Sequence, residues 1–105
     1  MNKILLFTAT YNESDNISLL IKKISNLNQE IDILIVDDNS PDKTYEIVNK
    51  LKNKYKNIYL KKRSEKLGLN TAHILGYEFA LKNNYSKLIT MDADYHMIQM
   101  RFRKL

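Results

Sequence analysis

The chain has 105 residues and a formal net charge of +5. This length allows one domain with a modest hydrophobic core and is too short for two. Because there is no cysteine, disulfides and thiolate metal sites are excluded, and any metal must take oxygen or imidazole ligands. Nucleic acid is not an expected partner, because the lysines are spread out and no aromatic-basic platform or recognition-helix pattern accompanies them.

Hydrophobic patterning predicts strands that alternate with helices. Continuous apolar runs predict strands, and apolar residues at helical spacing predict helices. The expected strands are residues 3–9, 31–36, 57–60 and 87–91, and the expected helices are residues 14–27, 40–55 and 71–82. The second helix is predicted from Ser40, the expected cap, followed by Pro41 at the first helical position.

The alternation of strands and helices implies an α/β fold with a Rossmann-like parallel sheet. The first two strands are apolar throughout, which suits a sheet that is covered on both faces. We expect the strand order 3-2-1-4, in which the chain changes direction between the first and the fourth strand. Ligands of such sheets bind at that point, outside the carboxyl ends of the strands.

Acidic residues gather directly after the predicted strands, although the chain as a whole is basic. Gathered like charges call for a cation or for hydrogen-bond donors. After the first strand, we expect Tyr11 to stack on a base and Glu13 to bind its edge, unless Glu13 only favours the positive end of the next helix. After the second strand, we expect one of Asp37 and Asp38 to cap a helix and the other to bind a ribose or base.

Asp92 and Asp94, separated by Ala93, follow the fourth strand. Both carboxylates can turn toward one Mg²⁺ or Mn²⁺, which would take further oxygens from a substrate diphosphate. Such a metal offsets the charge that develops on a departing nucleotide diphosphate. The alternative is a solvated surface turn. The chain has no Walker loop and no G-x-G-x-x-G sequence, so we expect the metal to bind the phosphates instead.

Four stretches, TYNESDNI, ILIVDDNSPDKT, EKLGLNTA and ITMDAD, together resemble family 2 glycosyltransferases, in particular the dolichyl- or polyprenyl-phosphate mannose synthases. The resemblance implies the N-terminal, nucleotide-binding half of a GT-A domain. It implies metal-dependent, inverting transfer of mannose from GDP-mannose to a polyprenyl or dolichyl phosphate at the cytoplasmic membrane face. It assigns Asp92 and Asp94 to catalysis and metal binding. The implied donor-binding residues are Tyr11, Glu13, Val36, Asp38, Asp92, Ala93 and Asp94.

Residues 95–105 show no obvious helix or strand period, and the resemblance stops at Asp94. Family members continue with a sequence like Leu-Ser-His-Asp-Pro, and a one-base shift of the reading frame before Tyr95 permits that sequence here. We therefore predict a donor-binding part of a GT-A domain at residues 1–94 and a frameshifted tail at residues 95–105. Because the acceptor site would lie beyond this fragment, we expect the fragment alone to be inactive.

Other interpretations stay open. A family 2 glycosyltransferase that uses another donor, such as UDP-glucose, shares much of the pattern. A stand-alone nucleotide-binding module is expected to end in a packed helix or strand. A nucleotidyltransferase is disfavoured, because Tyr11–Glu13 stands where a glycine- and basic-rich loop is expected. No apolar run approaches the ~20 residues of a membrane span, and no signal peptide is evident. We expect a cytoplasmic chain, with an anionic membrane surface as a further candidate partner.

Overall fold

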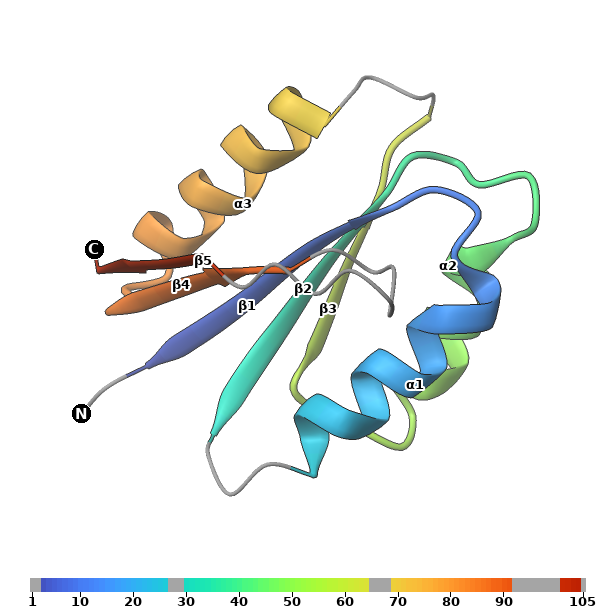
Figure 1. Ribbon diagram of the computed structural model, residues 1–105, viewed down its shortest axis with the longest axis horizontal. Helices are drawn as coiled ribbons and strands as arrows, with labels where there is room; N and C mark the ends of the chain where they lie inside the picture. Colours follow the sequence, from blue (N-terminus) through green and yellow to red (C-terminus); the bar gives the residue numbers. More distant parts are fainter. Residues whose placement is uncertain (1–2, 27–29, 65–68, 92–100, 105) are drawn as a thin grey trace.

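A computed structural model describes residues 3–26, 30–64, 69–91 and 101–104. Within these ranges, five strands form one sheet in the order β3-β2-β1-β4-β5, and the first four strands in this order run parallel. The predicted α/β sheet and its 3-2-1-4 order are therefore confirmed (Figure 1). The elements are β1 (Ile4–Thr10), α1 (Ser14–Ser25), β2 (Ile31–Asp37), α2 (Thr44–Leu51), β3 (Ile58–Lys62), α3 (Leu69–Lys82), β4 (Lys87–Thr90) and β5 (Arg101–Lys104).

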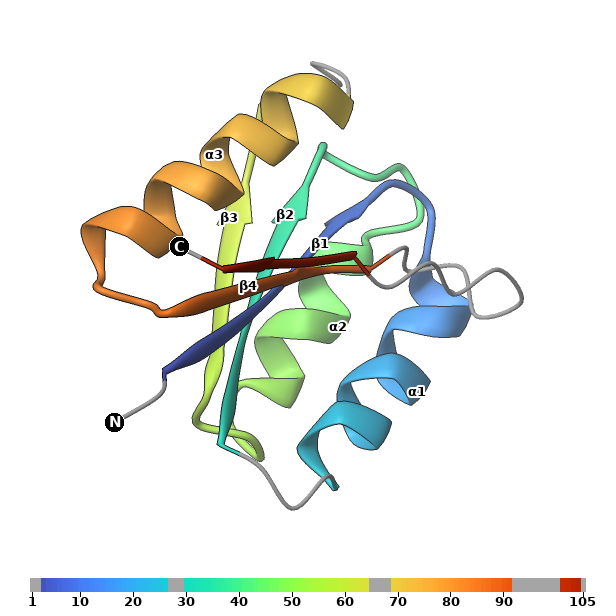
Figure 2. The ribbon, with the colours of Figure 1, turned by 60° about the vertical axis from the view of Figure 1, so that its left-hand side comes forward.

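Helices cover both faces of the sheet, as the apolar character of its strands requires. Helices α1 and α2 lie on one face and α3 lies on the other, which Figure 1 and the turned view in Figure 2 both show. Apolar residues at helical spacing on α1 pack against one face, and Ala72 and Ala80 of α3 pack against the other. The buried residues of α1 are Ile17, Leu20, Ile21 and Ile24.

The topology brings the carboxyl ends of β1, β2 and β4 to one edge of the sheet. The chain moves outward from β1 to β3 through α1 and α2, and α3 then returns it to β4 on the other side of β1. The backbone N–H of Met91, just after β4, donates to the carbonyl of Phe7 in β1 at 3.1 Å. The strand order therefore reverses between β1 and β4, which is the point where ligands of doubly wound sheets bind.

The prediction for α2 is wrong at both ends. The helix begins at Thr44 rather than at Ser40, because the Ser40 hydroxyl bonds to Asp37 and Lys43 has a positive φ of 60°, which no helical residue adopts. It ends at Leu51, whose carbonyl accepts from the N–H groups of Lys54 and Tyr55 in a closing turn. In the described ranges, no helix combines the length and apolarity that a membrane crossing needs.

The carboxyl-terminal segment contains a strand that the sequence pattern did not predict. Strand β5 pairs antiparallel with β4, with Leu88 opposite Arg103 and Ile89 opposite Phe102. An edge strand offers unpaired N–H and C=O groups to any extended segment, and that pairing needs no alternation of apolar side chains. The lack of an obvious strand period in residues 95–105 therefore did not rule out a strand at residues 101–104. The frameshift stays a prediction, because backbone pairing does not depend on the identity of the side chains.

At the amino ends of β2 and β4, opposite the carboxyl ends of the strands, the Tyr85 hydroxyl donates to Asp32 at 2.6 Å. Burial, together with this hydrogen bond and the charge of Asp32, raises the pKa of Tyr85 above its ordinary value of 10.0. The folded state thus holds the phenolic proton more tightly than the unfolded state. The resulting stabilisation is complete below about pH 10 and is lost as the pH rises above that value.

We therefore expect Tyr85→Phe to reduce the loss of stability between pH 9.5 and 11 by at least half, on the order of 1 kcal/mol over that interval. Urea denaturation at each pH measures this. Tyr77→Phe is the matched control, because Tyr77 is 41% exposed on α3 and should leave the slope unchanged. Equal slopes for the wild type and Tyr85→Phe would contradict the assignment.

Candidate donor-binding site

A buried carboxylate joins the ends of β1 and β2. Asp37 is fully buried, and its Oδ1 accepts from the hydroxyls of Thr10 and Ser40, each at 2.6 Å. Its Oδ2 accepts from the backbone N–H of Ser40 at 3.0 Å. The expectation that one carboxylate of Asp37 and Asp38 caps α2 is therefore wrong, because Asp37 shapes the turn before the helix and points inward. We infer a structural role for this carboxylate.

The loop after β1 and the loop after β2 are bound directly to each other. The backbone N–H groups of Asn12, Glu13 and Ser14 donate in turn to Ser40 Oγ (3.0 Å), Thr44 Oγ1 (3.1 Å) and Asp42 Oδ2 (3.1 Å). Unpaired N–H groups at the start of α1 thus find acceptors on the neighbouring loop. The arrangement fixes both loops as one unit at the carboxyl edge of the sheet.

Asp42 links this unit to the start of α2. Its Oδ1 accepts from the N–H and the hydroxyl of Thr44, at 3.0 and 2.5 Å. Desolvation of Asp42 opposes ionisation, but the hydrogen bonds from Thr44 and Ser14 outweigh it and lower the pKa of this carboxyl. Asp42 is therefore the carboxylate that accepts hydrogen bonds at the helix start, four positions beyond Asp38.

Asp38 points to a different partner. It forms a bidentate ion pair with Arg63, with Nε–Oδ1 at 2.5 Å and Nη2–Oδ2 at 2.8 Å. Arg63 Nη1 also donates to the hydroxyl of Thr71 in the first turns of α3, at 2.7 Å. Sequence reasoning missed Arg63, because it stands in a basic stretch with Lys61 and Lys62, and only the fold shows that it reaches Asp38.

The other predicted residues divide between this edge and the core. Tyr11 is 37% exposed at the edge, and Glu13 is half-buried, with its carboxylate accepting from Asn16 at 3.2 Å. The side chain of Val36 is fully buried, in the cluster between the sheet and α3, so only its backbone is available to a ligand. Asp92, Ala93 and Asp94 lie outside the described residues.

The described acids do not form a metal site among themselves. Within the ranges that the structure describes, no group of three or more His, Asp or Glu side chains could hold a metal. Asp37 and Asp38 are engaged with protein donors, as described above. The chain nonetheless reaches Met91, whose N–H donates to Phe7 of β1, directly before the Asp92-Ala93-Asp94 sequence. An all-oxygen donor set there fits Mg²⁺ or Mn²⁺.

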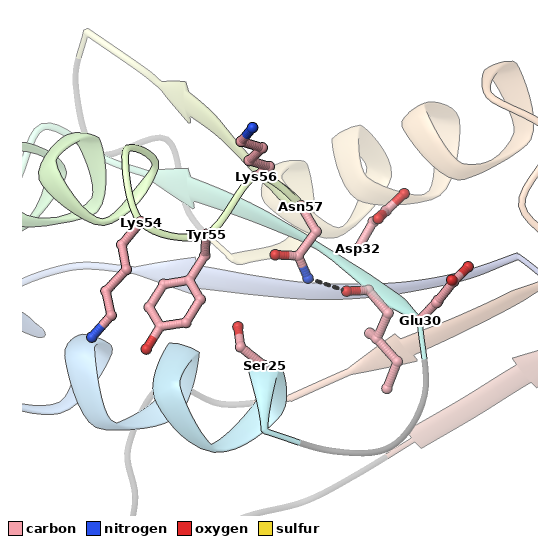
Figure 3. A pocket seen from close by; sticks show the side chains of 8 residues that line it. Ser25, Glu30, Asp32, Lys54, Tyr55, Lys56 and Asn57 are labelled. Carbon is pink, nitrogen blue, oxygen red and sulfur yellow. Dashed lines mark hydrogen bonds between the residues drawn. The ribbon is translucent and has the colours of Figure 1, made fainter.

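A separate pocket lies at the amino ends of β2 and β3, the opposite edge of the sheet (Figure 3). It measures about 430 Å³, and in it the Asn57 amide donates to the carbonyl of Ile31. Its wall mixes Glu30 and Asp32 with Lys54 and Lys56. This pocket lies away from the linked loops at the carboxyl edge, where parallel sheets place ligands. We therefore assign the candidate site to the loops rather than to the pocket.

The chain is similar to known glycosyltransferases over most of its length. The family model for glycosyl transferase family 2 matches residues 6–105, which include the predicted tail. The polyprenol monophosphomannose synthase of Mycolicibacterium smegmatis is 34% identical over 91 residues, 86% of this chain and 34% of that protein. The undecaprenyl-phosphate mannosyltransferase of Micrococcus luteus is 33% identical, over 88% of this chain and 38% of that protein. The dolichol-phosphate mannosyltransferase of Pyrococcus furiosus is 36% identical, over 88% and 26%.

Solved structures agree on the fold. A mannosyltransferase from Pyrobaculum calidifontis, in complex with GDP-Man and Mn²⁺, superposes with a TM-score of 0.74 at 21% identity, over 88% of this chain and 27% of that one. TarS (residues 1–349) of S. aureus superposes with a TM-score of 0.71 at 25% identity, over 88% and 27%. These are GT-A glycosyltransferases, so the predicted fold class is confirmed. The chain spans between about a quarter and two fifths of the relatives' lengths, and it belongs to glycosyltransferase family 2.

Proposed function

We propose that the carboxyl edge of this sheet binds the nucleotide of GDP-mannose, and that the protein transfers mannose from it to a polyprenyl or dolichyl phosphate. The linked loops after β1 and β2 carry the proposal, because they fix Tyr11, Glu13 and Asp38 at the edge where parallel sheets bind nucleotides. The relatives' names supply the donor sugar and the class of acceptor.

The proposed reaction is a single inverting displacement. An oxygen of the acceptor phosphate attacks C1 of mannose, the bond from C1 to the diphosphate breaks, and GDP leaves. The acceptor phosphate is already a nucleophile, so the protein chiefly has to hold it in line with C1. Asp92 and Asp94 would hold Mg²⁺ or Mn²⁺, which offsets the charge on the leaving diphosphate when it is bound. A lipid acceptor would place this reaction at a membrane surface.

Isothermal titration of this chain with GDP-mannose, GDP and UDP-glucose tests the donor site. With Mn²⁺ present we expect GDP-mannose to bind, and Tyr11→Ala to weaken it about tenfold through loss of base stacking. Tyr77→Ala is the matched control, because Tyr77 has a similar exposure, 41% against 37%, on the outer side of α3. Tighter binding of UDP-glucose would favour the alternative donor, and absence of all nucleotide binding would refute the proposal.

The metal assignment has its own readout. Paramagnetic resonance of added Mn²⁺ should show binding in the presence of GDP, and this binding should weaken in Asp94→Asn. Mn²⁺ binding that is equal in Asp94→Asn and the wild type would contradict the assignment. A transfer assay with polyprenyl phosphate completes the test. We expect no product from the 105-residue chain alone, and clear product would overturn that expectation.

A further inference from the structure

Arg63 joins three segments that are far apart in the sequence. Its guanidinium bonds both oxygens of Asp38 after β2, its Nη1 bonds Thr71 in α3, and its backbone N–H donates to the carbonyl of Asp37 at 2.7 Å. Arg63 itself directly follows β3. The residue is therefore held by both backbone and side chain at the edge of the candidate site.

The ion pair between Arg63 and Asp38 is shielded from water. The side chains of Arg63 and Asp38 are only 9% and 10% exposed. Charge-assisted, bidentate bonds of this kind fix orientation as well as energy, and solvent screens them much less than a surface pair. Lysine cannot reproduce the planar fork, because its ammonium is a single point of charge on a flexible stem. Arginine at this position therefore sets the direction of the Asp38 carboxylate.

Asp38 and Asp37 differ in what they leave for a ligand. Asp37 is fully buried and bonds only inward to Thr10 and Ser40. Asp38 receives one hydrogen bond from Arg63 on each oxygen, and each carboxylate oxygen can accept two. Asp38 thus keeps acceptor capacity for the hydroxyls of a ribose or the N–H groups of a base.

We infer that Arg63 is a positioning residue for the donor: it holds the Asp38 carboxylate in the orientation that accepts hydrogen bonds from the nucleoside, and Thr71 anchors Arg63 to α3. This inference rests on the proposed function, since it assumes a nucleotide at this edge. The arginine would act on binding only through Asp38. Replacing Arg63 should therefore weaken nucleotide binding in the wild type but have little further effect once the Asp38 carboxylate has been removed.

Titration of GDP into the full chain with Mn²⁺ tests the inference through a double-mutant cycle. We expect Arg63→Gln and Asp38→Asn each to weaken GDP binding about tenfold, and the double variant to be little weaker than either alone. Arg63→Lys should bind GDP more weakly than the wild type does, and should restore less than half of the affinity, as log Kd, that Arg63→Gln loses. Lys56→Gln is the matched control, because it removes the same charge at the opposite edge of the sheet and should leave binding unchanged.

Analogues separate positioning from a structural role. Arg63→Gln should reduce the preference for GDP over 2′,3′-dideoxy-GDP or over inosine diphosphate, which lack the ribose hydroxyls and the 2-amino group. A merely structural role would weaken all three ligands equally, and that result would overturn the inference, as would additive losses in the cycle. If Arg63→Gln fails to fold, Thr71→Val replaces it, with an expected loss of about threefold and the same change in preference. Absence of GDP binding by the wild type would overturn the proposed function and this inference with it.

Discussion

Replacing Asp37 with alanine is expected to lower the free energy of unfolding by about 3–5 kcal/mol. The change removes three hydrogen bonds to one carboxylate and leaves the hydroxyl of Thr10 and both donors of Ser40 without their acceptor. Asp37, Thr10 and Ser40 are each at most 2% exposed, so water cannot readily replace the lost bonds. A domain of this size has a total stability of roughly 5–15 kcal/mol, so the variant should be close to unfolding.

Urea denaturation followed by circular dichroism measures this effect. Asp42→Ala is the control, because Asp42 is exposed in the same pair of loops and also accepts bonds at a helix start; its loss should cost about 1 kcal/mol. Asp37→Asn keeps the shape but presents an amide to donors, and should fall between the two. If Asp37→Ala and Asp42→Ala lowered the free energy of unfolding equally, the buried carboxylate of Asp37 would stabilise the fold no more than the exposed one of Asp42.

Gly76→Ala is expected to destabilise the fold by about 1–3 kcal/mol, although alanine is the better helix former. A Cβ atom at Gly76 would lie 2.5 Å from Cδ1 and 2.8 Å from Cγ of Phe7. Phe7 is 1% exposed in the middle of β1, so its ring cannot move without disturbing the core between the sheet and α3. The glycine thus permits the close approach of α3 to the sheet.

The double variant Phe7→Leu, Gly76→Ala isolates this contact. Phe7→Leu alone should cost about 1 kcal/mol, since it replaces a ring with a smaller apolar group. In that background Gly76→Ala should cost much less than in the wild type, and denaturant midpoints of the four proteins give the coupling. If Gly76→Ala alone made the protein more stable, α3 would be able to move away from Phe7 at little cost, and the expected clash would be contradicted.

The sheet could be predicted from the sequence, because its order follows from local patterns and a general rule of chain handedness. The apolar runs at β1 and β2 and the spacing of Ile17, Leu20, Ile21 and Ile24 depend only on neighbours along the chain. The different hydrogen-bond partners of Asp37 and Asp38 could not be predicted from neighbours along the chain. It depends on Thr10, Ser40 and Arg63, which only the folded chain brings to them.

The start of α2 was mispredicted for a related reason. Ser40 followed by Pro41 is a good local signal for a helix start, but the hydroxyl of Ser40 is used by Asp37 and by the N–H of Asn12. A long-range hydrogen bond therefore overrode a local preference. The strand β5 shows the same effect on the backbone, since its pairing partner β4 lies more than ten residues earlier in the chain. The roles of Tyr11, Glu13, Val36, Asp92, Ala93 and Asp94 in binding stay predictions.

The hydrogen bonds that link the loops after β1 and β2 join residues 28 to 31 positions apart. Closing contacts of such separation costs chain entropy that is recovered only when both strand–helix units have docked. The edge that we propose binds the donor should therefore form late in folding, after the local helices. During synthesis on the ribosome, the linked loops cannot form until the start of α2 has been synthesised. We therefore do not expect shorter nascent chains to bind nucleotide.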